Sequence, residues 1–336
     1  MRRTLFHFVA AVSMAAAGMV SAVQAGTITF GSGGNTFNME FVTIGNPGNL
    51  ADNTGIPNPA GAVGYTYGIG KFEVSVDMIN KYNTNFGLDN SLEITTDQLG
   101  EKKPALSVSW NEAARFVNWL NTSTGNHAAY KFTTSGVNDN IALWDASDTL
   151  DYDPLNPYRS KRATYVLPSF NEWYKAAYYD PNKLGPGVGG YWDYANGSDT
   201  RPTAVTDGLS GAVYTEPGEA SPTGPADVDQ AGGLSPYGVM GLGGNVREWG
   251  ESSDNLANSS GSLQRGIRGG VWLSAFGELQ SSNREASDPT SGVFVDGFRV
   301  ASLSSSAPPA VPEPSMMVIG TLFGLGGLMA KRRMKK

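Results

Sequence analysis

Two apolar end segments confine the part of this chain that can fold as a water-soluble domain. Residues 1–25 begin with a short basic segment, continue with an apolar run from Leu5 to Val20, and end in small residues up to Ala25. This order is typical of a secretion signal, because signal peptidase accepts small side chains just before the bond that it cuts. We therefore predict export with cleavage by signal peptidase after Ala25. A buried N-terminal helix or a membrane anchor is the alternative.

The C-terminal end carries a second export feature. Residues 304–311 form a linker rich in Ser and Pro that has too little apolar surface to fold. Pro312, Glu313 and Pro314 follow, then an apolar stretch slightly short for a hydrocarbon core, and a basic end. This order resembles the PEP-CTERM sorting tail. The resemblance implies a transient transmembrane anchor over 312–336, cleavage by an exosortase near Pro-Glu-Pro, and delivery to the cell envelope, outer surface or extracellular matrix. A plain C-terminal membrane anchor is the alternative.

Composition restricts the chemistry of the remaining domain, residues 26–303. The chain has no cysteine, which excludes disulfides, thiolate nucleophiles and cysteine-based metal sites. Its two histidines are His7, within the predicted signal, and His127, so the mature chain has no site built from several histidines. Loss of both ends removes seven basic and one acidic side chains and changes the formal charge from −7 to −13. We expect no nucleic-acid partner, because such a surface repels phosphate.

Local patterns predict short strands joined by long loops. Alternating apolar residues within 27–44 and a run at 65–74 predict early strands, and Arg268–Trp272 and Gly297–Ala301 predict late ones. Clusters of Gly and Pro mark 182–235 as mostly loop. With 43 glycines in the chain, this pattern favours an α+β domain with little regular secondary structure.

Serine caps predict three helices. A short helix follows Ser75, and two Ser-x-x-Glu capping boxes, Ser109 with Glu112 and Ser169 with Glu172, each precede an apolar helical face. In such a box the hydroxyl and the carboxylate each satisfy a backbone N–H of the first turn. The two boxes therefore place the starts of the two better-marked helices.

Several of these segments, taken in order, resemble the domain of formylglycine-generating enzymes, the sulfatase-modifying factors. The resemblance covers about residues 37–302 and implies an irregular, loop-rich α+β fold related to C-type lectins. The segments that carry it are Lys71–Ser75, Pro104–Trp110, Ala113–Ala114, Trp119, Leu167–Ser169, Glu172–Trp173, Ala176–Ala177, Tyr237–Gly238, Gly244–Trp249, Arg268–Trp272, Asn283–Arg284 and Gly297–Arg299.

The resemblance does not extend to the copper chemistry of the family. Its enzymes bind copper through two cysteines shortly after the Arg-Gly-Gly segment, and those positions align with Ser274 and Leu279 here. Neither side chain can hold Cu(I), which prefers thiolates. We therefore expect no copper and no iron, and no copper-dependent formation of formylglycine.

Two site predictions follow from the resemblance. Asn245 and Glu248 match a region that holds structural calcium in the enzymes, and Ca²⁺ prefers oxygen ligands of this kind. A turn whose Asn and Glu satisfy backbone groups is the alternative. The former active-site groove would be lined by a set that includes an aromatic ring beside an arginine, suited to a sugar or peptide: Trp272, Ser274, Leu279, Asn283 and Arg284.

Alternatives remain for two of the residues carried over from the family. Trp272 could equally belong to the core. Arg299 and Glu248 are predicted to form a structural pair or hydrogen-bond anchors rather than a catalytic one.

The leading functional hypothesis is an exported surface or matrix protein whose enzyme-like domain is a non-catalytic binding or structural module. Exopolysaccharide or a surface glycan is the expected partner, besides signal peptidase and exosortase during export. The alternative is an enzyme of the same fold with cysteine-free chemistry, for example hydrolysis by paired carboxylates in a cleft. The sequence identifies no such pair.

Overall fold

The computed structural model describes residues 26–56 and 58–303 of the chain. The predicted secretion signal, linker and sorting tail lie outside these residues. Within them, no helix is both long enough and apolar enough to cross a membrane.

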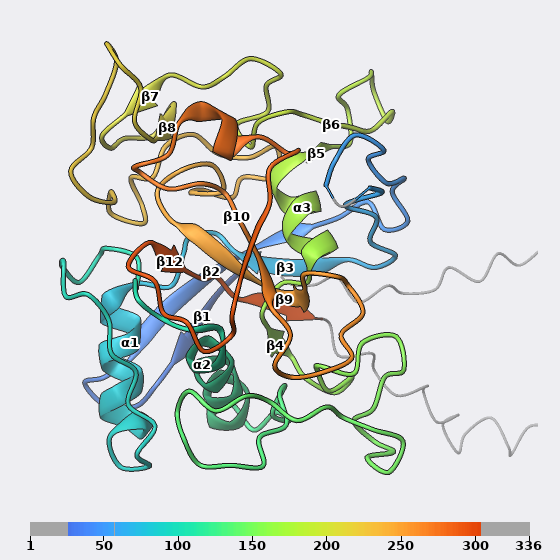
Figure 1. Ribbon diagram of the computed structural model, residues 1–336, viewed down its shortest axis with the longest axis vertical. Coiled ribbons are helices and arrows are strands. Elements are labelled where there is room, and N and C mark those ends of the chain that lie inside the picture. The colour runs from blue at the N-terminus through green and yellow to red at the C-terminus, as the bar shows by residue number, and fades with distance from the viewer. Residues whose placement is uncertain (1–25, 57, 304–336) are drawn as a thin grey trace, which may run out of the picture. The chain divides into compact units, whose positions relative to one another are not determined.

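A five-stranded antiparallel sheet forms the centre of the domain (Figure 1). Its order is β1-β2-β3-β13-β4, so β13, the last strand in the sequence, pairs with β3 on one side and β4 on the other. The strands are β1 (Gly26–Phe30), β2 (Phe37–Ile44), β3 (Tyr67–Gly70), β13 (Ala301–Leu303) and β4 (Tyr165–Val166). The predicted strand at 65–74 is therefore confirmed only in its middle.

Both faces of this sheet are covered by helices, as the side chains of β2 show. Phe37, Met39 and Phe41 join a core cluster with α1 (Val76–Tyr82) and α2 (Trp110–Ser123). Ile44 instead joins a second cluster with α3 (Phe170–Tyr178). Because neighbouring side chains of a strand point to opposite faces, α3 packs on one face and α1 and α2 on the other, as Figure 1 shows.

The three helices begin where their serines predict. Ser75 caps α1, which continues into a short π-helical segment, η1 (Asn83–Gly87). Ser109 and Ser169 form complete capping boxes with Glu112 and Glu172 at the starts of α2 and α3. Each box satisfies two otherwise unbonded N–H groups at the buried start of a helix.

A four-stranded sheet carries parts of three segments that resemble the family, Gly244–Trp249, Arg268–Trp272 and Gly297–Arg299, and its order is β11-β10-β9-β12. Its strands are β9 (Arg247–Ser253), β10 (Arg265–Arg268), β11 (Glu285–Ser287) and β12 (Asp296–Gly297). The predicted strand Arg268–Trp272 is wrong: β10 ends at Arg268, because Gly269 and Gly270 adopt φ values of 102° and 72° that turn the chain. The predicted strand Gly297–Ala301 is interrupted between β12 and β13.

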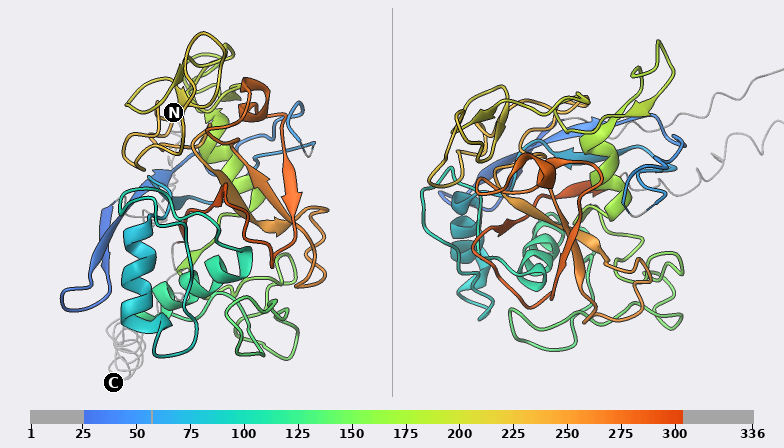
Figure 2. Two further views of the ribbon diagram at one scale, coloured as in Figure 1. Left: turned by 60° about the vertical axis from the view of Figure 1, so that its left-hand side comes forward. Right: turned by 45° about the horizontal axis from the view of Figure 1, so that its top comes forward.

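Long connections make up most of the remainder. The stretches 125–160 and 200–240 lie at opposite ends of the described domain (Figure 2). The predicted loop at 182–235 contains only three two-residue strands: β6 (Gly190–Tyr191), β7 (Ala204–Val205) and β8 (Ala212–Val213). β7 pairs with β8, and β6 pairs with β5 (Tyr179–Asp180), which precedes the loop. A 3₁₀ turn, η2 (Phe276–Leu279), precedes β11.

Candidate functional site

A buried ion pair joins Glu248 in β9 to Arg299 in the segment before β13. Glu248 accepts hydrogen bonds from Nε of Arg299 at 2.6 Å and from the indole N–H of Trp173 at 2.7 Å. Arg299 also donates to the carbonyls of Gly70 and Met240. Both charged side chains are fully buried, so each compensates the other in a medium of low polarity. The prediction of a structural pair is confirmed.

A second buried acid, Glu73, adjoins this pair. Its Oε1 accepts a hydrogen bond from Nδ2 of Asn245 at 2.9 Å, and its Oε2 has no partner among the described residues. Burial raises the pKa of Glu73 to about 7; the charge of Arg299 opposes the rise and the charge of Glu248 adds to it. Two buried carboxyl groups therefore lie near one guanidinium, which is bonded to Glu248.

The predicted calcium ligands are engaged by the protein itself. Oδ1 of Asn245 accepts the backbone N–H of Ala226 at 2.8 Å, and Glu248 is held by Arg299 and Trp173. In residues 26–56 and 58–303, no three His, Asp or Glu side chains gather as a metal site. This arrangement fits the alternative, a turn in which Asn245 and Glu248 accept hydrogen bonds from the protein. A calcium ion would have to displace the donors, which are Ala226, Arg299 and Trp173. Calcium binding itself stays a prediction.

The two positions aligned with the copper cysteines are packed and bonded. Oγ of Ser274 accepts the backbone N–H of Val271 at 2.9 Å and donates to the carboxylate of Glu278. Leu279 is buried in an apolar cluster with Tyr194 and other side chains. These side chains offer no thiolate, so they do not fit copper.

The five predicted groove residues do not come together in one cavity. Trp272 is 5% exposed and belongs to an apolar cluster with Val246. Arg284 instead binds Asp254 at 2.6 Å and stacks over the ring of Phe170, and the carbonyl of Asn283 accepts a bond from Arg268. Of the five, only Leu279 lines a described pocket, which has room for about one water.

The site with the best-defined polar geometry is a cavity of about 500 Å³ at the start of α3, here called the Arg159 pocket. Four separate segments line it: Tyr65–Thr66, 153–161, Ser169–Asn171 and 252–258, together with Leu303. Its volume lies within the usual range for small-molecule sites. The sequence pattern placed Ser169 at a helix start but gave no sign that the other segments would meet it.

Arg159 lies between two fully buried carboxylates at this pocket. Its Nη2 is 2.9 Å from Oε1 of Glu172 and its Nη1 is 3.6 Å from Oε2 of Glu251. The hydroxyl of Tyr65 accepts from Nη2 at 3.0 Å and donates to Glu172, and Nδ2 of Asn156 donates to Glu251 at 2.6 Å. The network therefore holds the pocket's polar groups in fixed positions.

The two acids of this network differ in their pKa values. Burial alone would raise the pKa of Glu172, but the charge and hydrogen bonds of Arg159, with the bonds from Tyr65 and Ser169, hold it below its usual value. Burial raises the pKa of Glu251; Arg159 opposes this and Glu172 adds to it. Arg159 is therefore fully compensated by acids.

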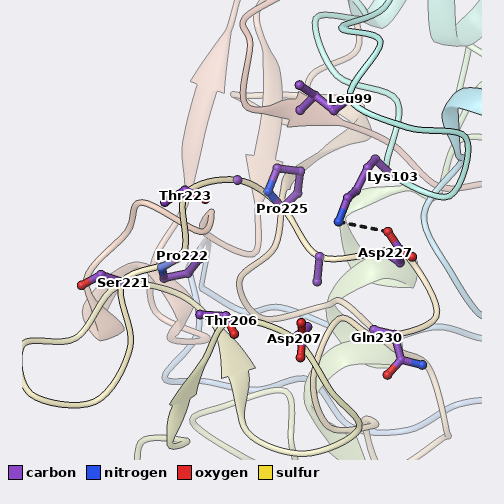
Figure 3. A pocket seen from close by; sticks show the side chains of 12 residues that line it. Leu99, Lys103, Thr206, Asp207, Ser221, Pro222, Thr223, Pro225, Asp227 and Gln230 are labelled. Atoms are coloured by element: carbon purple, nitrogen blue, oxygen red, sulfur yellow. Dashed lines mark ion pairs between the residues drawn. The ribbon is translucent and has the colours of Figure 1, made fainter.

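A second cavity, of about 520 Å³, lies among loops and is here called the Asp227 pocket. Figure 3 shows Lys103 and Asp227 pointing toward each other across it, 3.0 Å apart. Asp207 also lines it and forms no ion pair with any described residue. Pro222 and Pro225 line it from the segment that precedes Asp227 (Figure 3). The cavity contains no aromatic ring.

Comparisons with known proteins agree with this fold. Treponema denticola variable protein 1 superposes with a TM-score of 0.55 at 20% identity over 82% of this chain and 98% of its own. CarF gives a TM-score of 0.55 at 18% identity over 79% and 98%, and PvdO from Pseudomonas aeruginosa 0.48 at 18% over 82% and 97%. At such identities the likeness concerns the fold alone.

Sequence comparison gives the family. No curated protein matches the chain. The model of the sulfatase-modifying factor enzyme 1-like domain, named FGE-sulfatase, matches residues 12–303. Because this match spans most of the sequence, the chain belongs to the sulfatase-modifying factor family.

Proposed function

We propose that this protein is an exported, exosortase-sorted surface or matrix protein whose family domain is a non-catalytic binding or structural module. The observation that carries the proposal is how the side chains of Ser274 and Leu279 are bonded and packed. Oγ of Ser274 accepts a backbone hydrogen bond within a turn, and Leu279 packs in an apolar cluster. The two positions that align with the copper-binding cysteines therefore hold side chains that stabilise the fold. The domain keeps the fold without the groups that perform the family's chemistry.

The sorting part of the proposal rests on the two ends of the sequence. Signal peptidase acts after Ala25, and exosortase acts near Pro312, Glu313 and Pro314 once the tail anchors the chain. The product is displayed at the outer surface or in the matrix, where exopolysaccharide or a surface glycan is the partner. A loop-rich α+β domain related to C-type lectins suits such a role.

The non-catalytic role is tested with an aldehyde assay. The protein is incubated with copper, oxygen and a peptide that carries the sulfatase cysteine, and the aldehyde is trapped with a hydrazide and measured by mass spectrometry. We expect no product above a copper-only control. Turnover that depends on the protein would overturn the non-catalytic role.

Sorting is tested in cells by fractionation. Replacing Pro312, Glu313 and Pro314 by alanines is expected to retain the protein in the membrane fraction, whereas the unchanged chain is recovered at the surface or in the matrix. The same distribution for both chains would contradict exosortase processing.

The alternative, cysteine-free catalysis, has one observation in its favour. Glu172 and Glu251 are two acids gathered at the Arg159 pocket, as a carboxylate-based hydrolase requires. Both side chains are fully buried, however, and Arg159 is bonded to each. Hydrolysis of a panel of nitrophenyl glycosides that is lost in Glu251→Gln would favour the enzyme over the binding module.

A further inference from the structure

The Arg159 pocket has more acidic than basic side chains in and beneath its walls. Arg159 and Lys161 line it, while Asp153, Glu172 and Glu251 line or underlie it with three carboxylates. Arg159 is only 11% exposed in its side chain, and its guanidinium is already engaged. Lys161 is exposed and donates to the carbonyl of Thr149, but a phosphate, sulfate or carboxylate that paired with it would also meet the carboxylate of Asp153 in the same pocket.

The two fully buried acids are not accessible to a cationic ligand either. Glu172 and Glu251 have no exposed side-chain surface and lie behind Arg159 and Tyr65. An ammonium group in the pocket would have to break the existing ion pairs to reach them. The electrostatics favour an uncharged ligand.

The walls combine neutral hydrogen-bonding groups with apolar surface. The side-chain amides of Asn156, Asn171 and Asn258 and the hydroxyl of Ser252 line the cavity, and amides both donate and accept. Tyr65 and Leu155 add exposed apolar surface on the same cavity; Leu155 is 91% exposed.

A saccharide presents hydroxyl groups around its edge and C–H groups on its faces, and this matches the two kinds of wall. Binding would also cover Leu155, a large apolar side chain that is otherwise left in water. The Asp227 pocket has no aromatic ring among its lining residues. It matches a neutral saccharide less well.

We propose that the Arg159 pocket binds uncharged saccharide units, with the amides of its rim meeting their hydroxyls and Tyr65 and Leu155 packing on their C–H faces. This proposal rests on the proposed binding role and names its site and ligand class.

The test is calorimetric titration of the full-length protein. The probes are neutral hexasaccharides of glucose, mannose and galactose, and a charged hexamer of galacturonic acid. The variant Leu155→Ser removes exposed apolar surface at the pocket, and Leu50→Ser is its matched control, since Leu50 is 86% exposed and does not line the pocket. Thermal unfolding of both variants confirms that they are folded.

We expect a neutral hexamer to bind saturably, and the uronate hexamer to bind at least tenfold more weakly. Leu155→Ser should weaken binding about tenfold, the loss expected when most of one leucine contact is removed, and Leu50→Ser should leave it unchanged. Equal or tighter binding of the uronate would overturn the uncharged ligand. A loss at Leu50→Ser, or none at Leu155→Ser, would overturn the site while leaving the binding role intact. If none of the hexamers binds, this inference is overturned. The non-catalytic role and the sorting are tested separately, by the aldehyde assay and by cell fractionation.

Discussion

The burial of the Glu73 carboxyl group predicts how the free energy of unfolding changes with pH. Glu73 is 1% exposed, its Oε2 has no partner among the described residues, and the nearby guanidinium of Arg299 is bonded to Glu248. These surroundings raise its pKa from 4.5 to about 7, chiefly because burial disfavours the charged form.

The sign follows from which state releases its proton first. Between pH 4.5 and about 7 the unfolded chain loses the Glu73 proton while the folded protein keeps it, so the free energy of unfolding falls as pH rises. Each pH unit of this interval corresponds to about 1.4 kcal/mol. From pH 5 to pH 8 the expected loss from Glu73 is therefore about 2.5 kcal/mol.

The substitution Glu73→Gln removes this loss, because the amide keeps the shape and has no charge to bury. Urea unfolding at pH 5 and pH 8 measures it: relative to the unchanged protein, the variant should gain about 2.5 kcal/mol between the two pH values. Glu93→Gln, at an exposed glutamate, is the control and should show no such gain. Parallel pH dependences for Glu73→Gln and the unchanged protein would refute the reasoning.

Three further predictions concern other buried or bonded groups. Burial lowers the pKa of Lys175 to about 8, and its Nζ donates only to the carbonyl of Asn46, so Lys175→Met should raise the free energy of unfolding at pH 7 by about 1–2 kcal/mol. That gain should shrink toward pH 9.5 in urea titrations, since the folded protein releases this proton first; a loss at pH 7 would contradict it. Arg299→Met should cost about 3–5 kcal/mol by leaving Glu248 buried without its partner, and the double change with Glu248→Gln should restore part of it. If calcium binds at Asn245 and Glu248 as predicted, calorimetry should give a lower Tm with EDTA than with calcium; the same Tm would contradict the calcium prediction and fit a turn in which both side chains already have protein partners.

Local features of the fold could be read from the sequence because their causes are local. Each capping box needs only a serine and a glutamate three residues apart, and both boxes formed as predicted at Ser109 and Ser169. The strand predicted at Arg268–Trp272 failed because Gly269 and Gly270 lie in the left-handed region, as a Gly-Gly pair at a turn often does; Arg268, Val271 and Trp272 were given more weight than this turn signal.

The candidate site was less accessible to sequence reasoning because it depends on distant segments. Arg159 forms an ion pair with Glu251, which lies more than ninety positions later in the chain, and a hydrogen bond with Tyr65, which lies more than ninety positions earlier. No spacing rule links such residues. The groove carried over from the family placed Trp272 beside Arg284, whereas the fold separates them: one joins an apolar cluster and the other stacks on Phe170.

The position of β13 has a consequence for the export that we propose for this chain. The strand that joins β3 to β4 is Ala301–Leu303, so the central sheet stays in two pieces until the last residues of the domain arrive. Arg299, the partner of Glu248, arrives just before it. We expect a chain ending at residue 298 to be digested by protease at the rate of an unfolded polypeptide, and protection of that fragment would contradict this. If the chain is exported as proposed, this dependence on the final residues would keep it unfolded, and able to pass through a translocation channel, until its synthesis is nearly complete.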